Sequence, residues 1–308
     1  MLSESHLKDL KGKGCRKVLL QIPEGLKPRA QELAGILRKE GIEAIVSVEP
    51  CFGACDLRDR EAKALGCDAV LHIGHSPLMP ETEVPVVYDE YRQDFSPVPL
   101  LERHLGQLPY NSLCLVTTIQ HIGSLAKAKA FLESKGKTVY IGQPTSARYP
   151  GQILGCDHSA ALSLEDEAEA FLFIGSGLFH PLGLAEKTEK PVLFLDKESG
   201  ELKDLSEERL RRQKIRAASL AKASMSQNFG ILVSTKAGQM NLKAAERARE
   251  SLEKKGKKAW MLAADLITPE KLLGLKLDCL VNCACPRITE DTSLFKKPII
   301  TADEALSL

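Results

Sequence analysis

The chain has 308 residues, of which 44% are hydrophobic, and its 42 basic residues nearly balance its 41 acidic ones. This length accommodates two or three domains with substantial cores. The balanced charge argues against direct nucleic-acid binding through a basic surface, and no acidic block indicates disorder.

The N-terminal segment MLSESHLKDLKGKGCRK is polar and lacks the apolar h-region of a signal peptide. Apolar runs such as VLLQI are too short to span a bilayer. We therefore expect a cytoplasmic protein that does not enter the membrane. In that reducing compartment its nine cysteines should not form structural disulfides, so each is a buried small hydrophobe, a ligand or a reactive group.

Short, continuous and β-branched apolar segments run through the chain, as in parallel strands that are covered on both faces. The first block predicts strands at 17–23, 43–49, 68–75 and 84–90 and helices at 28–40 and 56–66. The second predicts strands at 112–120, 138–144, 171–177 and 191–197 and helices at 124–136 and 180–188. The third predicts strands at 228–235, 258–265, 277–284 and 298–304 and helices at 241–256 and 269–275.

The three blocks share one order of elements. In each, the first helix ends in Lys-Gly or Glu-Gly and leads into the second strand, and a glycine at that place usually adopts a positive φ. We predict an α/β protein of three small doubly wound domains with parallel sheets, at 1–100, 101–204 and 205–308. The last begins with a charged linker helix at 205–225.

Three cysteine-containing segments follow predicted strands, where open parallel sheets bind ligands. They are EPCFGACDL (49–57), TSARYPGQILGCD (145–157) and VNCACPRITED (281–291), each with Gly or Pro beside a cysteine. Cys15, Cys67, Cys114 and Cys279 instead have the surroundings of packed or incidental thiols.

The spacing of the cysteines indicates a metal centre but leaves its ligands open. Spacing does not choose between Cys51 and Cys55, or between Cys283 and Cys285. Zinc sites usually contain local pairs such as C-x-x-C, and this sequence has none. One cysteine per repeat favours an iron–sulfur cluster, whose thiolate ligands converge from separate segments.

At these residues the sequence resembles the archaeal diphthamide synthase family, which catalyses the first step of diphthamide biosynthesis. The matching segments occur in the family's order over nearly the whole chain. They are QIPEGLK (21–27), EPCFGACD (49–56), HIGHSPL (72–78), RYPGQILGC (148–156), GSGLFHPLG (175–183), STKAGQ (234–239) and VNCACPRI (281–288).

The resemblance implies pseudo-threefold symmetry and a 4Fe–4S cluster held by Cys55, Cys156 and Cys285. Cys51 is the first substitute for Cys55, and Cys283 is a neighbour of the cluster. Three ligands leave one iron open for S-adenosylmethionine (SAM). Reductive cleavage of SAM then yields a 3-amino-3-carboxypropyl radical, which adds to a histidine of translation elongation factor 2. The resemblance also implies a homodimer, and it leaves the electron donor unknown.

Candidate SAM contacts follow the strands within the matching motifs. They are Gln21, Glu24, Gly25, His75, Ser234, Thr235, Lys236, Gly238 and Gln239. A carboxylate such as Glu24 would bind the SAM ammonium group, and backbone N–H groups around Gly238 would bind its carboxylate. His180 and Arg148 are expected on the side of the substrate imidazole, whereas His72 and Arg287 have structural roles.

Two alternatives remain at this stage. Quinolinate synthase resembles the same plan of three repeats with one cysteine each, and there the open iron acts as a Lewis acid on a small dicarboxylate. The chain is alternatively a non-catalytic subunit that keeps a partner's cluster reduced. All three cysteine motifs are present, which favours catalysis by the chain itself.

Overall fold

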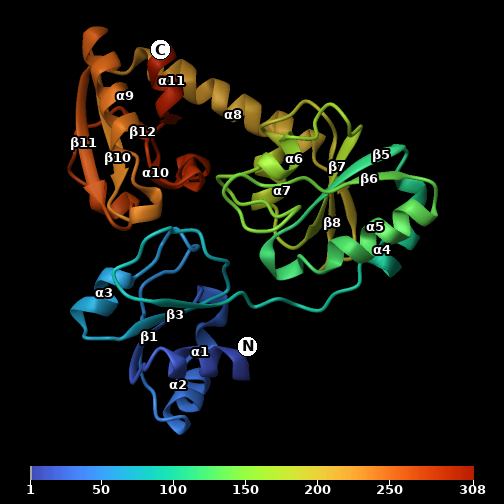
Figure 1. Ribbon diagram of the computed structural model, residues 1–308. Helices are drawn as coiled ribbons and strands as arrows, with labels where there is room; N and C mark the ends of the chain where they lie inside the picture. Colours follow the sequence, from blue (N-terminus) through green and yellow to red (C-terminus); the bar gives the residue numbers. More distant parts are fainter. Residues whose placement is uncertain (1) are drawn as a thin grey trace. The chain divides into compact units, whose positions relative to one another are not determined.

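The structure is a computed structural model that describes residues 2–308, apart from the side chain of residue 291 (Figure 1). The chain divides into two compact units. Unit 1 runs to Leu184 and includes Thr188–Asp204, and unit 2 comprises Ala185–Lys187 and Leu205–Leu308. Unit 1 contains two sheets and unit 2 contains one.

The first sheet of unit 1 has the strand order β2-β1-β3-β4, and all neighbours are parallel. Its strands are β1 (Lys17–Gln21), β2 (Glu43–Val46), β3 (Ala69–Ile73) and β4 (Val86–Asp89), and its helices are α1 (Glu4–Gly12), α2 (Ala30–Lys39) and α3 (Asp59–Ala64). Every residue of β3 is buried, because helices and loops cover both faces of this central strand.

The second sheet has the order β6-β5-β7-β8-β9. Its strands are β5 (Ser112–Val116), β6 (Thr138–Tyr140), β7 (Ala170–Gly175), β8 (Val192–Asp196) and β9 (Leu202–Asp204), and its helices are α4 (Val98–His104), α5 (Ser124–Ser134), α6 (Ser159–Leu162) and α7 (Phe179–Ala185). The edge strand β9 is antiparallel to β8 and was not predicted. Its three partly exposed or exposed residues carry no apolar run that would signal a strand.

The sheet of unit 2 has the order β11-β10-β12-β13 and is parallel throughout. Its elements are α8 (Ser206–Met225), β10 (Asn228–Ser234), α9 (Leu242–Lys254), β11 (Lys258–Ala264), β12 (Cys279–Asn282), α10 (Thr292–Phe295), β13 (Ile299–Thr301) and α11 (Ala302–Ser307). The strand predicted at 298–304 was wrong in its second half. Thr301 and Glu304 form a capping box there, which ends the strand and begins α11.

Short 3-10 helices occur in the connections. They are η1 (Glu24–Arg29), η2 (Leu105–Gln107), η3 (Ile119–His121), η4 (Ala237–Gln239), η5 (Pro269–Leu272) and η6 (Pro286–Asp291). Three of them, η1, η4 and η6, lie in the motifs that were singled out from the sequence.

The three sheets repeat one topology, in which the second strand of each block pairs with the first and the first pairs with the third. This confirms the predicted α/β class with parallel sheets. The predicted helix-terminal glycines are also confirmed, because Gly41, Gly136 and Gly256 have φ values of 78°, 83° and 73°. The boundaries at 100/101 and 204/205 stay predictions. No helix among residues 2–308 is long and apolar enough to cross a membrane.

Candidate metal centre

Accessibility divides the nine cysteines into two groups. Six are buried, with at most 6% of their surface exposed: Cys15, Cys51, Cys67, Cys114, Cys279 and Cys283. The other three are Cys55 and Cys285, which are partly exposed, and Cys156, which is exposed. A cluster needs thiolates that reach iron outside the packed core, so the second group has the accessibility of ligands.

The pKa values of the buried thiols support the same division. Burial raises the pKa of Cys114 and Cys279 to about 12 and that of Cys283 to about 11. With these raised pKa values the three side chains stay protonated at neutral pH. The thiolate is the form that binds metal. Cys283 and Cys285 are therefore distinguished by burial, although the sequence spacing treats them alike.

Hydrogen bonds hold the loop of Cys55 at the end of β1. The side-chain amide of Gln21 donates to the Asp56 carbonyl at 2.5 Å and accepts from the Arg58 N–H at 3.2 Å. The buried Arg58 guanidinium also pairs with the buried Asp56 carboxylate at 3.2 Å. On the other side, a Cβ on Gly53 would lie 3.3 Å from the Cys55 sulfur, so a glycine leaves room for the thiol.

A buried carboxylate fixes the turn of Cys156. The Asp157 side chain accepts hydrogen bonds from the backbone N–H groups of Ser146, Ala147 and Ser159 at 2.6 to 3.0 Å. Burial acts to raise the pKa of Asp157, but these bonds and that of the Ser159 hydroxyl outweigh it and lower the pKa overall. Gly155 packs so closely on Phe179 that a Cβ would lie 2.3 Å from its ring.

Gln152 links the RYPGQILGC and HIGHSPL motifs within unit 1. Its Oε1 accepts from the backbone N–H groups of Arg148 and Tyr149, each at 3.1 Å. Its Nε2 donates to the Ser76 hydroxyl at 2.9 Å. The loop of Cys156 is therefore tied to the segment that follows β3.

Asn282 shapes the turn of Cys285 in unit 2. Its Oδ1 accepts from the Ala284 N–H at 3.0 Å, and its Nδ2 donates to the Cys285 carbonyl at 2.8 Å. Pro286 then begins η6, and the Ile288 N–H also donates to that carbonyl at 3.0 Å. Because of this turn, Cys285 lies outside the core immediately after β12, whereas Cys283 is buried in the core.

Two of the predicted SAM contacts in unit 1, Gln21 and His75, are linked by hydrogen bonds through His72, and two others lie at the surface. Gln21 is buried, and its Oε1 lies 3.0 Å from Nδ1 of His72, whose Nε2 lies 2.9 Å from Nδ1 of His75. Glu24 and Gly25 are exposed in η1, where Glu24 pairs with Lys27 at 2.5 Å. The amide of Gln21 is thus engaged inside the protein.

The predicted contacts of unit 2 gather at the carboxyl end of β10. The buried Ser234 hydroxyl accepts from the Lys236 N–H at 3.2 Å and lies 3.5 Å from Oε1 of Gln239. The Lys236 side chain is buried, and its Nζ lies 3.9 Å from the Asp265 carboxylate. Thr235 and Gly238 are exposed in the same turn. A buried lysine beside a half-exposed carboxylate suits the binding of a charged small molecule.

A family model of diphthamide synthesis proteins matches residues 22–308. The chain belongs to the diphthamide synthesis family. It is 41% identical over 302 residues to 2-(3-amino-3-carboxypropyl)histidine synthase of Pyrococcus horikoshii, which covers 97% of this chain and 87% of that protein. Subunit 1 of the human synthase is 32% identical, covering 94% of this chain and 67% of the relative.

Solved structures agree with the sequence relatives. The crystal structure of Dph2 from Pyrococcus horikoshii with a 4Fe-4S cluster superposes with a TM-score of 0.92 at 40% identity, covering 99% of this chain and 90% of that one. These comparisons confirm the resemblance inferred from the motifs, and with it the expectation that this member of the diphthamide synthesis family is an enzyme.

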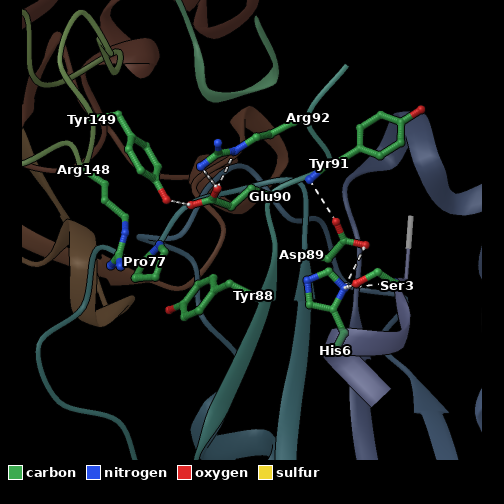
Figure 2. A pocket seen from close by; sticks show the side chains of 10 residues that line it. All are labelled: Ser3, His6, Pro77, Tyr88, Asp89, Glu90, Tyr91, Arg92, Arg148 and Tyr149. Atoms are coloured by element: carbon green, nitrogen blue, oxygen red, sulfur yellow. Dashed lines mark hydrogen bonds and ion pairs between the residues drawn. The ribbon is translucent and has the colours of Figure 1, made fainter. Parts of the chain in front are cut away.

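Sequence reasoning missed a polar cavity of about 480 Å³ in unit 1 (Figure 2). Its lining residues are Ser3, His6, Pro77, Tyr88, Asp89, Glu90, Tyr91, Arg92, Arg148 and Tyr149. The Glu90 carboxylate accepts from the Tyr149 hydroxyl at 2.8 Å and from Arg92 at 2.6 Å, and the Arg92 guanidinium lies 4.6 Å from the centre of the Tyr149 ring. The run YDEYR at the end of β4 is the sequence signal that could have revealed this cavity.

The two residues expected near the substrate imidazole have different surroundings. Arg148 is exposed and lines the cavity, with its guanidinium 5.8 Å from the Tyr149 ring. His180 is partly buried, and its ring is parallel to that of Phe173 with the centroids 6.4 Å apart. Their roles in the diphthamide synthesis reaction stay predictions.

Proposed function

We propose that this chain is a 2-(3-amino-3-carboxypropyl)histidine synthase that transfers the 3-amino-3-carboxypropyl group of SAM to a histidine of translation elongation factor 2. The observation that carries the proposal is the accessibility of Cys55, Cys156 and Cys285, while the other described cysteines are buried. The similar Dph2 of Pyrococcus horikoshii has been solved with a 4Fe-4S cluster.

The donor set suits such a cluster. Cys55 and Cys156 belong to unit 1 and Cys285 to unit 2, and each thiol follows a strand of a different sheet. Three thiolate ligands would leave one iron for SAM. When bound, a 4Fe–4S cluster supplies the electron that cleaves the bond between the SAM sulfur and its γ-carbon, and methylthioadenosine is the leaving product.

The residues around the thiols have the task of holding them in place. Gln21 and Arg58 fix the loop of Cys55, Asp157 fixes that of Cys156, and Asn282 fixes that of Cys285. Such supporting hydrogen bonds preserve ligand geometry and tune the cluster. Because the amide of Gln21 is used in this way, we assign it a positioning role in place of direct SAM contact.

The remaining SAM contacts form two groups. In unit 2 the turn of Ser234, Thr235, Lys236, Gly238 and Gln239 offers backbone N–H groups and a buried ammonium group for the SAM carboxylate. In unit 1 the exposed Glu24 offers a carboxylate for the SAM ammonium group, with Gly25 beside it, and His75 stays a predicted contact. A charged substrate is bound best by such charge-assisted hydrogen bonds.

The partners follow from the diphthamide synthesis family. The reaction has a protein substrate, and translation elongation factor 2 is the substrate that the resemblance implies. A homodimer and a cytoplasmic location remain predictions. Neither alters the assignment of the cysteines.

The proposal is tested first by counting metal. Protein purified without oxygen should contain about four irons and four sulfides per chain. Replacing Cys55, Cys156 or Cys285 by Ala should remove the brown absorbance and most of the iron. Cys51→Ala and Cys283→Ala are matched controls from the same two loops and should keep the iron.

The activity is tested on the wild-type protein alone. With a strong reductant, SAM and elongation factor 2 it should release methylthioadenosine and add the 3-amino-3-carboxypropyl mass to the factor. An intact cluster without methylthioadenosine would indicate a non-catalytic subunit. Turnover of a small dicarboxylate instead would indicate chemistry of the quinolinate synthase type.

A further inference from the structure

A second group of metal-ligating side chains lies beside Cys55, and of its three members only His75 was predicted to contact SAM. Cys51, in the loop after β2, and His72 and His75, at the end of β3, come from two segments of the first sheet. Their possible ligand atoms all lie within 4.8 Å of one another. Cys51 and His72 are 4% and 0% exposed, and His75 is partly exposed.

The hydrogen bonds of Gln21 determine which nitrogen of His72 is available. Because Nε2 of Gln21 donates to the Asp56 carbonyl, its Oε1 faces the Arg58 N–H and Nδ1 of His72. An oxygen only accepts, so Nδ1 of His72 carries the proton. Nε2 of His72 is therefore unprotonated and faces His75.

This arrangement is typical of a metal-binding histidine. Such a histidine donates its second ring N–H to a carboxylate or carbonyl oxygen, which fixes its tautomer and orientation. In this protein the acceptor is the amide oxygen of Gln21, which lies 3.0 Å from Nδ1 of His72. Nε2 of His72 lies 2.9 Å from Nδ1 of His75, so the two nitrogens are close enough to bind one cation.

The protonation states of the ligands also suit a cation. Metal ligands must be deprotonated thiolates and neutral imidazoles. The hydrogen bond of Nδ1 of His72 to Gln21 leaves its Nε2 lone pair available, as a metal ligand requires. Binding would release the Cys51 thiol proton, and the His75 ring would carry its proton on Nε2 and bind through Nδ1.

We propose that Cys51, His72 and His75 form a mononuclear zinc site, separate from the cluster ligands. One thiolate and two imidazoles are a donor set that zinc binds in tetrahedral geometry, whereas magnesium and calcium require oxygen ligands. Three protein ligands leave a fourth position for water or a substrate atom. The site also gives the buried Cys51 a role that the cluster does not require.

The test counts zinc and iron in the same sample. Cluster-containing wild-type protein is incubated with excess Zn²⁺, desalted and analysed by inductively coupled plasma mass spectrometry. We expect about one tightly held zinc per chain beside the irons of the cluster. Cys51→Ser and His75→Ala should each reduce the retained zinc at least tenfold and leave the iron content unchanged.

Cys283→Ser is the matched control, because Cys283 is a thiol with the same 4% exposure in the other unit. It should retain the zinc. Since His75 is partly exposed, His75→Ala tests the site even if the buried Cys51→Ser variant does not fold. The Cys156→Ala variant, which should lose the cluster, should still bind zinc, so this inference and the proposed function can fail separately.

X-ray absorption at the zinc edge identifies the ligands directly. The wild-type protein should show one sulfur at about 2.3 Å and two nitrogens at about 2.0 Å. Zinc that is absent after desalting, that is unchanged in Cys51→Ser, or that has three sulfur ligands would overturn the proposal. The last result would place the metal on the cluster cysteines.

Discussion

At the scale of single residues, burial separates the cysteines into two groups. Cys283 continues the hydrogen bonding of β12, with its N–H donating to the Leu232 carbonyl at 3.0 Å, and its side chain joins the core of unit 2. Two residues later Cys285 has left the sheet and is accessible. Burial raises the pKa of Cys283 to about 11, so the change from strand to turn favours Cys285 as the proposed ligand.

Gly155 allows a test of how closely the loop of Cys156 is packed. In Gly155→Ala the added Cβ would lie 2.3 Å from the Phe179 ring, so we expect a loss of about 1–3 kcal/mol in the free energy of unfolding and a lower iron content. Urea unfolding and iron analysis measure the two effects. Gly35→Ala in α2 is the control, because nothing lies near its added Cβ and an alanine favours the helix.

His121 gives unit 1 a pH-dependent stability. Burial, and to a smaller extent Lys197, lowers the pKa of His121 to about 4, so the folded protein keeps this ring neutral. The unfolded chain binds the proton near pH 6.5, and stability therefore falls as the pH decreases from about 6.5 to about 4, by about 3 kcal/mol in total. His121→Phe should reduce the slope of this dependence in urea unfolding series at different pH values. An unchanged slope would contradict the assignment.

At the scale of elements, loops and helix caps depend on single polar side chains. Asp157 and Asn282 each organise one cysteine turn, and Asn241 begins α9 by accepting from the Ala244 N–H at 3.1 Å. These groups satisfy backbone donors that no strand or helix would otherwise use. The elements nearest the proposed cluster therefore depend on side-chain hydrogen bonds as well as on apolar packing.

The capping box of α11 can be tested by one substitution. The Thr301 hydroxyl accepts from the Glu304 N–H at 3.2 Å, and the Glu304 carboxylate accepts from the Thr301 N–H at 2.7 Å. Thr301→Ala should lower the free energy of unfolding of unit 2 by about 1 kcal/mol. Fluorescence of Trp260, the single tryptophan, reports on this unit during urea unfolding. Thr301→Ser keeps the hydroxyl and should unfold like the wild type.

At the scale of the whole molecule, each unit has apolar cores of its own. The proposed cluster takes ligands from both units, so its binding should couple their stabilities by mass action. In cluster-free protein, Gly155→Ala should leave the Trp260 transition of unit 2 unmoved, because the substitution lies in unit 1. In cluster-containing protein the same substitution should shift it. Identical shifts in both forms would show that the units are coupled without the cluster.

The sequence alone determined the α/β class, most strands and the order of the three blocks, because buried parallel strands leave continuous apolar runs and their helices end at glycines such as Gly41. It missed β9 and the beginning of α11, since a short polar edge strand and a cap depend on neighbours that local periodicity does not record. The motifs indicated the family, and the comparisons confirmed it.

Tertiary structure decided what spacing could not. It buried Cys51 and Cys283, left Cys55 and Cys285 accessible, and used the amide of Gln21 within the protein. Burial and hydrogen bonding depend on residues far apart in the chain. Two cysteines of one short segment can therefore differ, with one packed in the core and the other accessible to a metal. The convergence of Cys51 with His72 and His75 likewise exists only because parallel strands end at the same edge of a sheet.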